Sequence, residues 1–152
     1  MNIEEILKKS KKIVITTHQS PDGDAIGSSL ALFGYLVKKG FDVSVVVPDS
    51  FPKFLKWMEG AENVHVYDYE ENVVKGLISE ADLIFSLDYN DLTRVGGVGD
   101  LIARATAYKA MIDHHLHPAD FADWMCSDTS SCSTAQLIYN FIEDFNDLDL
   151  ID

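Results

Sequence analysis

Polar side chains able to bind a metal ion follow three apolar segments of this 152-residue sequence. The first segment is followed by His18-Gln19-Ser20-Pro21-Asp22-Gly23-Asp24, the second by Asp88, and the third by Asp113-His114-His115. If the apolar segments are parallel strands, their carboxyl ends lie along one edge of a sheet, where ligand crevices form. Four aspartates and three histidines would then converge on a single edge.

Such a group of side chains is suited to binding divalent cations. Several carboxylates in one crevice would repel one another and lose hydration unless cations neutralise them. Carboxylates with a minority of imidazoles suit Mn²⁺, with Mg²⁺, Co²⁺ or Zn²⁺ as alternatives, and the lack of cysteine in these segments argues against structural zinc. There are enough ligands for two ions, and a bridging aspartate would create a two-metal phosphoryl-transfer centre. The alternative, in which Asp22 and Asp24 cap a helix and Asp88 ends a strand, does not account for their joint placement with a double histidine.

Runs of β-branched and apolar residues predict the strands that position these side chains. Long strands are expected at 12–17, 41–47, 82–87 and 107–112, and a short one at 64–67. Helical periodicity is clearest at 25–39, where one apolar face carries Ile26, Leu30, Phe33 and Val37 and where Gly40 ends the helix. Further helices are expected at 54–58, 70–80 and 131–145, the last capped by Ser131 or a neighbouring hydroxyl.

This alternation of strands and helices predicts an α/β fold. We expect a Rossmann-like, doubly wound, mainly parallel sheet with helices on both faces. The length of 152 residues corresponds to one domain with its own core. The tail from Asp144 to Asp152 is interpreted either as a solvated end or as part of a linker.

Composition excludes several classes of protein and partner. Asp and Glu number 25 against 12 Lys and Arg, and a net charge of −13 disfavours binding of long duplex nucleic acid through phosphates. No apolar run approaches the roughly 18 residues of a membrane span, so no membrane association is expected. The two cysteines, Cys126 and Cys132, are too few for a disulfide scaffold and favour a reducing cytoplasm.

The ordered set of polar residues resembles the first three motifs of the DHH phosphoesterase superfamily. The matching residues are His18-x-x-Pro21-Asp22-x-Asp24-x-x-Gly27-Ser28, Asp88 followed by Arg94, and Asp113-His114-His115. Ser133-Thr134-Ala135 is similar to a later segment of the family. The motifs span residues 13 to about 140 in family order, and the ordered set is far more specific than Asp-His-His alone.

The resemblance implies a role for each matching residue. One metal would be held by His18, Asp22 and Asp88, and a second by Asp24, Asp88 and His114, with Asp88 bridging. Asp113 would orient a histidine, and His115 would face the substrate phosphate as a hydrogen-bond donor or proton source. Arg94 would either neutralise that phosphate or pair with an acid such as Asp91. Ser28, in the first turn of a helix, and Ser133 are candidates for substrate contact, although helix capping is the stronger interpretation for Ser133 and Thr134.

The sequence departs from the family pattern in one respect. Family members carry a further aspartate in a Thr-Asp-Thr-like strand, followed by a linker and a smaller substrate-binding domain. Neither feature is found in residues 1–152. We therefore expect these residues to be the DHH catalytic domain of a longer protein, weakly active when isolated.

The resemblance implies a metal-dependent phosphoesterase. The first motif is most similar to the branch that degrades short oligoribonucleotides and dephosphorylates 3′-phosphoadenosine 5′-phosphate, and this implies two Mn²⁺ ions, with Mg²⁺ or Co²⁺ as alternatives. A RecJ-like single-strand exonuclease, a cyclic-dinucleotide phosphodiesterase and, in another class, a non-catalytic nucleotide-binding module remain alternatives. The implied partners are short RNA or small nucleotides, and a homodimer also stays open.

Overall fold

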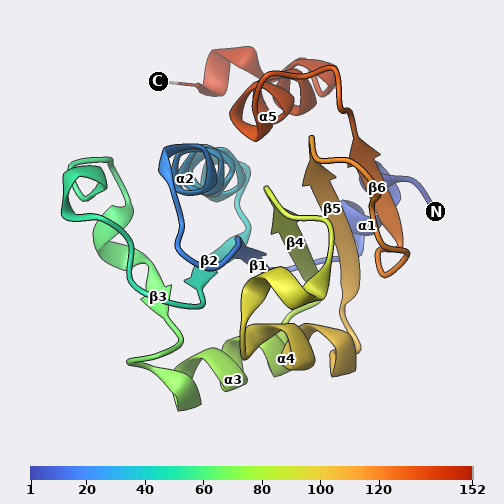
Figure 1. Cartoon of the computed structure of the whole chain (residues 1–152). Helices are drawn as coiled ribbons and strands as arrows, with labels where there is room; N and C mark the ends of the chain where they lie inside the picture. The colour runs from blue at the N-terminus through green and yellow to red at the C-terminus, as the bar shows by residue number, and fades with distance from the viewer. Residues whose placement is uncertain (152) are drawn as a thin grey trace.

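The computed structural model describes residues 1–151, which contain one six-stranded sheet in the order β3-β2-β1-β4-β5-β6 (Figure 1). Every pairing between neighbouring strands is parallel. The prediction of a doubly wound α/β fold is confirmed. The strands are β1 (Lys12–Thr16), β2 (Asp42–Val47), β3 (His65–Val66), β4 (Leu83–Leu87), β5 (Tyr108–Asp113) and β6 (Trp124–Ser127).

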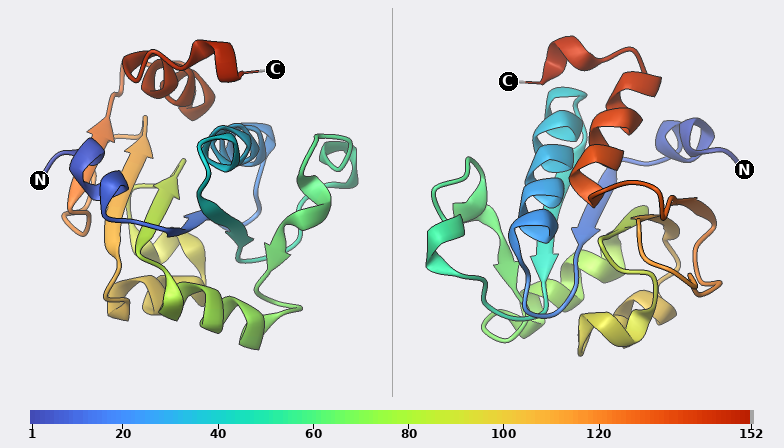
Figure 2. Two further views of the ribbon diagram at one scale, coloured as in Figure 1. Left: turned by 180° about the vertical axis from the view of Figure 1, so that it is seen from behind. Right: turned by 45° about the horizontal axis from the view of Figure 1, so that its top comes forward.

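Helices cover both faces of the sheet, with α2 and α5 on one face and α3 and α4 on the other (Figure 1). Figure 2 shows that α2 and α5 lie side by side on the same face of the sheet. The helices are α1 (Ile3–Lys8), α2 (Gly23–Lys38), α3 (Glu71–Glu80), α4 (Val98–Arg104) and α5 (Thr134–Asp144).

The central strands are buried on both faces, because alternate side chains enter two different cores. Ile13 and Ile15 pack with α1, α2 and α5, whereas Val14 between them packs with α3 and α4. Every residue of β4 is buried. On the α5 side, Phe85 meets Phe141 edge-on, with ring centroids 6.1 Å apart. The ends of β1 and β4 are thus held rigidly by packing on two sides.

Several elements differ from the sequence-based expectation. The helix expected at 54–58 is a short 3-10 turn at Lys53–Leu55. The last helix begins at Thr134, and its cap is Ser133, whose Oγ accepts from the Gln136 amide at 3.1 Å. Helices α1 and α4 and the edge strand β6 were not predicted, because each has only four to seven residues and therefore too little periodicity.

The order of the strands reverses direction between β1 and β4. From β1 the chain moves outward to β2 and β3, and it then returns to β4 on the other side of β1. Loops at the carboxyl ends of β1 and β4 therefore diverge, which is the topological switch point where ligands bind in open parallel sheets. Within residues 1–151, no helix has both the length and the apolar character needed to cross a bilayer.

The acidic tail is folded against α2 rather than solvated as far as the structure describes it, and Asp152 lies outside the described residues. The Tyr35 hydroxyl donates to Asp147 Oδ2 at 2.6 Å, and the Lys39 ammonium lies 2.9 Å from the same oxygen. Lys38 donates to the Leu150 carbonyl at 2.8 Å. These two donors to Asp147 hold the pKa of its carboxyl below the ordinary value.

Replacing Asp147 by Asn should lower the stability of the fold in a pH-dependent way. A carboxyl whose pKa is lowered on folding stabilises the native state above its ordinary pKa of about 4, and this contribution disappears as the pH falls through the lowered value. Urea unfolding should therefore separate Asp147→Asn from the wild type at pH 7 and bring the two curves together near pH 3. Asp149→Asn, at an exposed neighbouring aspartate, is the matched control and should stay within about 0.5 kcal/mol of wild type. Equal stability of Asp147→Asn and wild type at pH 7 would show that the tail contact is dispensable.

Candidate metal centre

The candidate site lies where β1, β4 and β5 end side by side. His18 follows β1, Asp88 follows β4, and Asp113 is the last residue of β5. Hydrogen bonds continue past the strand ends: the Thr17 hydroxyl donates to the Leu87 carbonyl at 2.9 Å, and the Asp88 amide donates to the Ile112 carbonyl at 3.1 Å. The three motif segments are therefore joined directly to one another.

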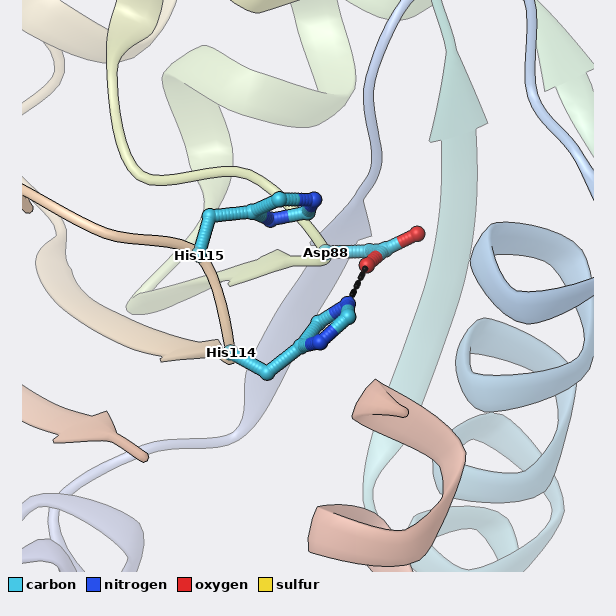
Figure 3. Close-up of side chains that lie close together, drawn as sticks. All are labelled: Asp88, His114 and His115. Atoms are coloured by element: carbon cyan, nitrogen blue, oxygen red, sulfur yellow. Dashed lines mark ion pairs between the residues drawn. The ribbon is translucent and has the colours of Figure 1, made fainter. Parts of the chain in front are cut away.

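Asp88 is at the centre of the group. It is only 2% exposed, and its backbone has a φ of 63°, in the left-handed region that aspartate tolerates better than most residues. His18 Nε2 lies 3.2 Å from Asp88 Oδ2, and His114 Nε2 lies 3.3 Å from Oδ1. Figure 3 shows the imidazoles of His114 and His115 beside this carboxylate. The two carboxylate oxygens thus face two different histidines.

Further groups compensate the buried charge of Asp88. The Thr134 hydroxyl donates to Oδ1 at 3.0 Å. Although burial acts to raise it, the pKa of Asp88 is lowered by the hydrogen bonds from His18 and Thr134. The same contact with Asp88 raises the pKa of His18. Asp88 is therefore held as a carboxylate.

His18, Asp22 and Asp88 form the first group of potential metal ligands, with one ligand atom from each residue within 4.8 Å of the others. His18 Nδ1 lies 2.6 Å from the Gln19 carbonyl, which can only accept, so Nδ1 carries a proton and Nε2 faces the carboxylates. Asp22 Oδ1 lies 3.8 Å from Nε2 and also caps α2 by accepting from the Ala25 amide at 2.9 Å. Asp22 can therefore cap α2 and still bind a metal ion.

Around the other oxygen of Asp88, the second group brings together Asp88, His114 and His115, whose ligand atoms also lie within 4.8 Å of one another. Asp24, which the sequence assigns to this metal, approaches from α2, with its Oδ2 3.6 Å from His114 Nε2. Burial, together with the neighbouring Asp88 carboxylate, raises the pKa of Asp24 despite two backbone hydrogen bonds. A second cation beside His114 would relieve this repulsion.

Asp113 fixes the orientation of His115. It is fully buried, and its Oδ1 lies 2.6 Å from His115 Nδ1 while its Oδ2 accepts from the His115 amide at 2.9 Å. The carboxylate therefore holds the Nδ1–H tautomer, and Nε2 is left for a ligand or substrate. Such a pairing fixes the ring so that its second nitrogen points to one side of the site.

Asp24 connects α2 to α5 at the edge of the site. Its carboxylate accepts from the Thr134 amide at 3.0 Å and from the Ala135 amide at 2.9 Å, the first two amides of α5. These amides have no partner within the helix, and the positive end of the helix dipole also favours the negative charge. The sequence favoured capping for Thr134, whereas capping belongs to Ser133 and Thr134 contacts both Asp24 and Asp88. Only the run of hydroxyl residues before α5 signals this role.

Five of the predicted site residues are not part of the two ligand groups: Asp24 and Asp113, which contact members of those groups, and Ser28, Ser133 and Arg94. Ser28 is fully buried and donates to the Ala25 carbonyl at 3.2 Å; because α2 begins at Gly23, Ser28 lies in the second turn and not in the first as predicted. Ser133 is occupied with capping. Arg94 is exposed on a 3-10 turn and forms no salt bridge with any acid in residues 1–151, including Asp91. Its carbonyl accepts from the Gln19 amide at 2.8 Å, which places the turn beside the first motif.

The chain is similar to known proteins in family, sequence and structure. The family model described as DHH family, N-terminal domain, matches residues 12–151. The chain is 32% identical over 142 residues to the bifunctional oligoribonuclease and PAP phosphatase NrnA of Thermus thermophilus, a match covering 93% of this chain and 40% of that protein.

Two solved structures are similar to this chain in fold. An exopolyphosphatase-related protein from Bacteroides fragilis is 41% identical with a TM-score of 0.96, covering 98% of this chain and 44% of that one. The manganese-bound exonuclease RecJ, at 17% identity and a TM-score of 0.52 over 93% of this chain and 36% of that one, shares the fold alone. The chain thus spans less than half the length of the relatives it matches. Residues 12–151 match the N-terminal domain throughout, and the chain belongs to the DHH family.

Proposed function

We propose that the chain is the catalytic domain of a metal-dependent phosphoesterase that hydrolyses short oligoribonucleotides, 3′-phosphoadenosine 5′-phosphate, or both. The observation that carries this proposal is the buried Asp88 carboxylate, which presents one oxygen to His18 and the other to His114. A bridging ligand between two ions requires this arrangement. The name of the Thermus relative, which covers both substrates, supports the same substrate class.

The donor set fits two divalent cations. A metal with bonds of about 2.1 Å places neighbouring ligand atoms about 3–3.4 Å apart, close to the 3.2 and 3.3 Å between Asp88 and its two histidines. His18, Asp22 and Asp88 would hold one ion, and Asp24, Asp88 and His114 the other. Carboxylates with few imidazoles favour Mn²⁺, with Mg²⁺ or Co²⁺ as alternatives. When bound, the pair would supply an activated water and neutralise charge on the phosphate.

His115 and Arg94 would contact the substrate, and Asp113 would orient His115. His115 Nε2 would donate to a phosphate oxygen or to the leaving oxygen, and the buried Asp113 carboxylate would hold the ring in the orientation for this donation. The exposed Arg94 would contact the phosphate from the turn beside Gln19. Ser133 remains a candidate for a weaker substrate contact, because its hydroxyl can donate while it accepts from the Gln136 amide.

Two of the three alternative functions fit the molecule less well. A non-catalytic nucleotide-binding module would not need a crowded group of carboxylates, which is costly to bury without cations. The net charge of −13 disfavours long nucleic acid and so a RecJ-like exonuclease. A cyclic-dinucleotide phosphodiesterase remains an alternative because it would use the same motifs. The two free cysteines support a reducing compartment, and we propose the cytoplasm.

Activity should depend on the metal and fall with substrate length. The complete protein, stripped of metal and resupplied with Mn²⁺, should hydrolyse oligoribonucleotides of about two to five nucleotides faster than a 20-mer, because the acidic surface repels extended phosphate chains. Asp88→Asn should lower the rate by at least about 100-fold, since a neutral amide with one oxygen cannot bridge two ions. A labelled length series measures both effects. Faster cleavage of the 20-mer would favour the RecJ-like alternative, and no Mn²⁺-dependent hydrolysis of any nucleotide would refute the proposal.

His114 and His115 should differ in what their removal changes. His114→Ala should weaken Mn²⁺ binding, and excess Mn²⁺ should restore part of the activity. His115→Ala should leave Mn²⁺ affinity close to wild type and lower kcat, because its contact strengthens as charge develops on the phosphate. Isothermal titration with Mn²⁺ and steady-state kinetics distinguish the two variants. Equal Mn²⁺ affinities would contradict the division of roles.

Thr134 should support metal binding without contacting the ions. Thr134→Val keeps the shape of the side chain but removes the hydroxyl that donates to Asp88. Loss of a hydrogen bond to a ligand is expected to weaken Mn²⁺ affinity about 10- to 100-fold. Thr134→Ser keeps the hydroxyl and should recover most of this affinity. Unchanged affinity in Thr134→Val, measured by titration calorimetry, would mean that the contact is only structural.

A further inference from the structure

The segment between β2 and β3, residues 48–64, contacts the loop of the metal centre. Ser20, in the loop between His18 and Asp22, donates its amide to Asp49 Oδ1 at 2.8 Å. Leu55 packs at the start of α2, where its Cδ2 would lie 4.0 Å from a Cβ at Gly23. In Figures 1 and 2 the segment lies beside α2, on the side away from β5 and β6. It is therefore joined to the loop that carries two of the potential metal ligands.

The segment exposes two aromatic side chains on a firmly anchored backbone. Phe51 and Leu55 are 8% and 6% exposed and pack in an apolar cluster with Ile26 of α2. Phe54 and Trp57, which alternate with them, are 73% and 81% exposed. Large apolar groups displayed together on a surface commonly mark a binding site. Because buried Phe51 and Leu55 fix the backbone, the segment would lose little conformational freedom when a ligand binds Phe54 and Trp57.

The same segment also presents two cations. Lys53 and Lys56 lie within residues 50–58, which contain no acidic residue, whereas Asp49 and Glu59 flank this stretch. Both lysines are exposed, and Lys56 Nζ lies 5.7 Å from the centre of the Phe51 ring. Cations that alternate with exposed aromatic rings are typical of surfaces that bind single-stranded nucleic acid.

A hollow next to this segment adds room for a ring-shaped ligand. Its volume of about 300 Å³ is at the lower end of small-molecule sites. Tyr69, which follows β3 and is 74% exposed, lines it together with buried Phe51. The remaining lining includes Lys56, Glu62, Val64 and Val66. Apolar walls with one cation and one carboxylate acceptor match a nucleobase, which has apolar faces and polar edges.

We propose that Phe54, Trp57 and the hollow beside Tyr69 form a nucleobase-binding surface that holds nucleotides of an oligonucleotide lying away from the metal centre. Lys53 and Lys56 contact the phosphates between those nucleotides. β2 is two strands from β4, or about 10 Å in the sheet, so an oligonucleotide held at Asp88 would meet this surface by extending toward the β2 and β3 side of the sheet. The inference rests on the proposed function, because it names the surface that would bind the rest of that substrate.

Base stacking on Trp57 can be measured without catalysis. In EDTA, titration of the complete protein with penta-adenylate should quench the fluorescence of the exposed Trp57, whereas half-buried Trp124, which packs against Phe141, should respond little. Trp57→Ala should remove the quenching and weaken binding about tenfold, and Trp57→Phe should retain most of the affinity. Tyr139→Ala, at an aromatic residue 50% exposed on α5, is the matched control and should bind as the wild type does.

Kinetics with Mn²⁺ give an independent readout. Trp57→Ala and Phe54→Ala should raise KM for the pentanucleotide more than KM for 3′-phosphoadenosine 5′-phosphate, which has no further nucleotide to bind. The double variant Lys53→Gln/Lys56→Gln should reduce the salt dependence of binding. If Trp57→Ala and Phe54→Ala bind penta-adenylate as tightly as Tyr139→Ala does, the proposed surface is wrong.

Two further outcomes separate this inference from the proposed function. A wild-type protein that binds penta-adenylate through Trp57 but hydrolyses no nucleotide with Mn²⁺ would refute the phosphoesterase proposal alone. Hydrolysis that is unaffected by Trp57→Ala and Phe54→Ala would refute the nucleobase surface alone. Analytical ultracentrifugation tests whether a second copy of the protein covers this surface instead. If the wild type is a dimer and Trp57→Ala is a monomer, the aromatic residues contact that second copy and the inference is wrong.

Discussion

Asp88 carries a negative charge in the interior of the protein, and the surrounding structure compensates that charge from several directions. An isolated buried carboxylate would be protonated or would destabilise the fold. Here His18, His114 and the Thr134 hydroxyl approach its two oxygens from three separate segments of the chain. Its φ of 63° turns the chain sharply as it leaves β4. A strained, buried residue that organises three distant segments is characteristic of a functional centre.

The remaining architecture brings these segments together and keeps them there. β1 and β4 are neighbours in the sheet although they are about 70 residues apart in the chain, and the doubly wound connection makes their loops diverge at the point where ligands bind. From above the sheet, the first amides of α5 hold the Asp24 carboxylate. The helix dipole therefore offsets part of the repulsion between Asp24 and Asp88. Fold stability and organisation of the site depend on the same contacts.

The sequence was sufficient to predict the central part of this arrangement. β1, β4 and β5 are long and apolar, and the polar residues after them have the types and order of the family motifs, so their convergence followed from the strand-end rule. Contacts that depend on tertiary geometry could not be predicted. Whether Ser133 or Thr134 caps α5 depends on the direction of entry into the helix, and the exact start of α2 moved Ser28 from the first turn into the buried second turn. Short elements such as α4 and β6 carry too few residues for a pattern.

The distribution of charge, rather than its total, connects the fold to the choice of substrate. The carboxylates of Asp22, Asp24 and Asp88 are gathered at one edge of the sheet, where cations can neutralise them locally. Elsewhere the acidic surface repels extended polyanions, and the exposed Lys53 and Lys56 offer two cations one strand beyond the first motif. If the proposed function holds, a short oligonucleotide would contact both regions while exposing few phosphates to the acidic surface, whereas each added nucleotide of a long chain would meet repulsion. Under the proposed function, selectivity for short substrates would follow from electrostatics.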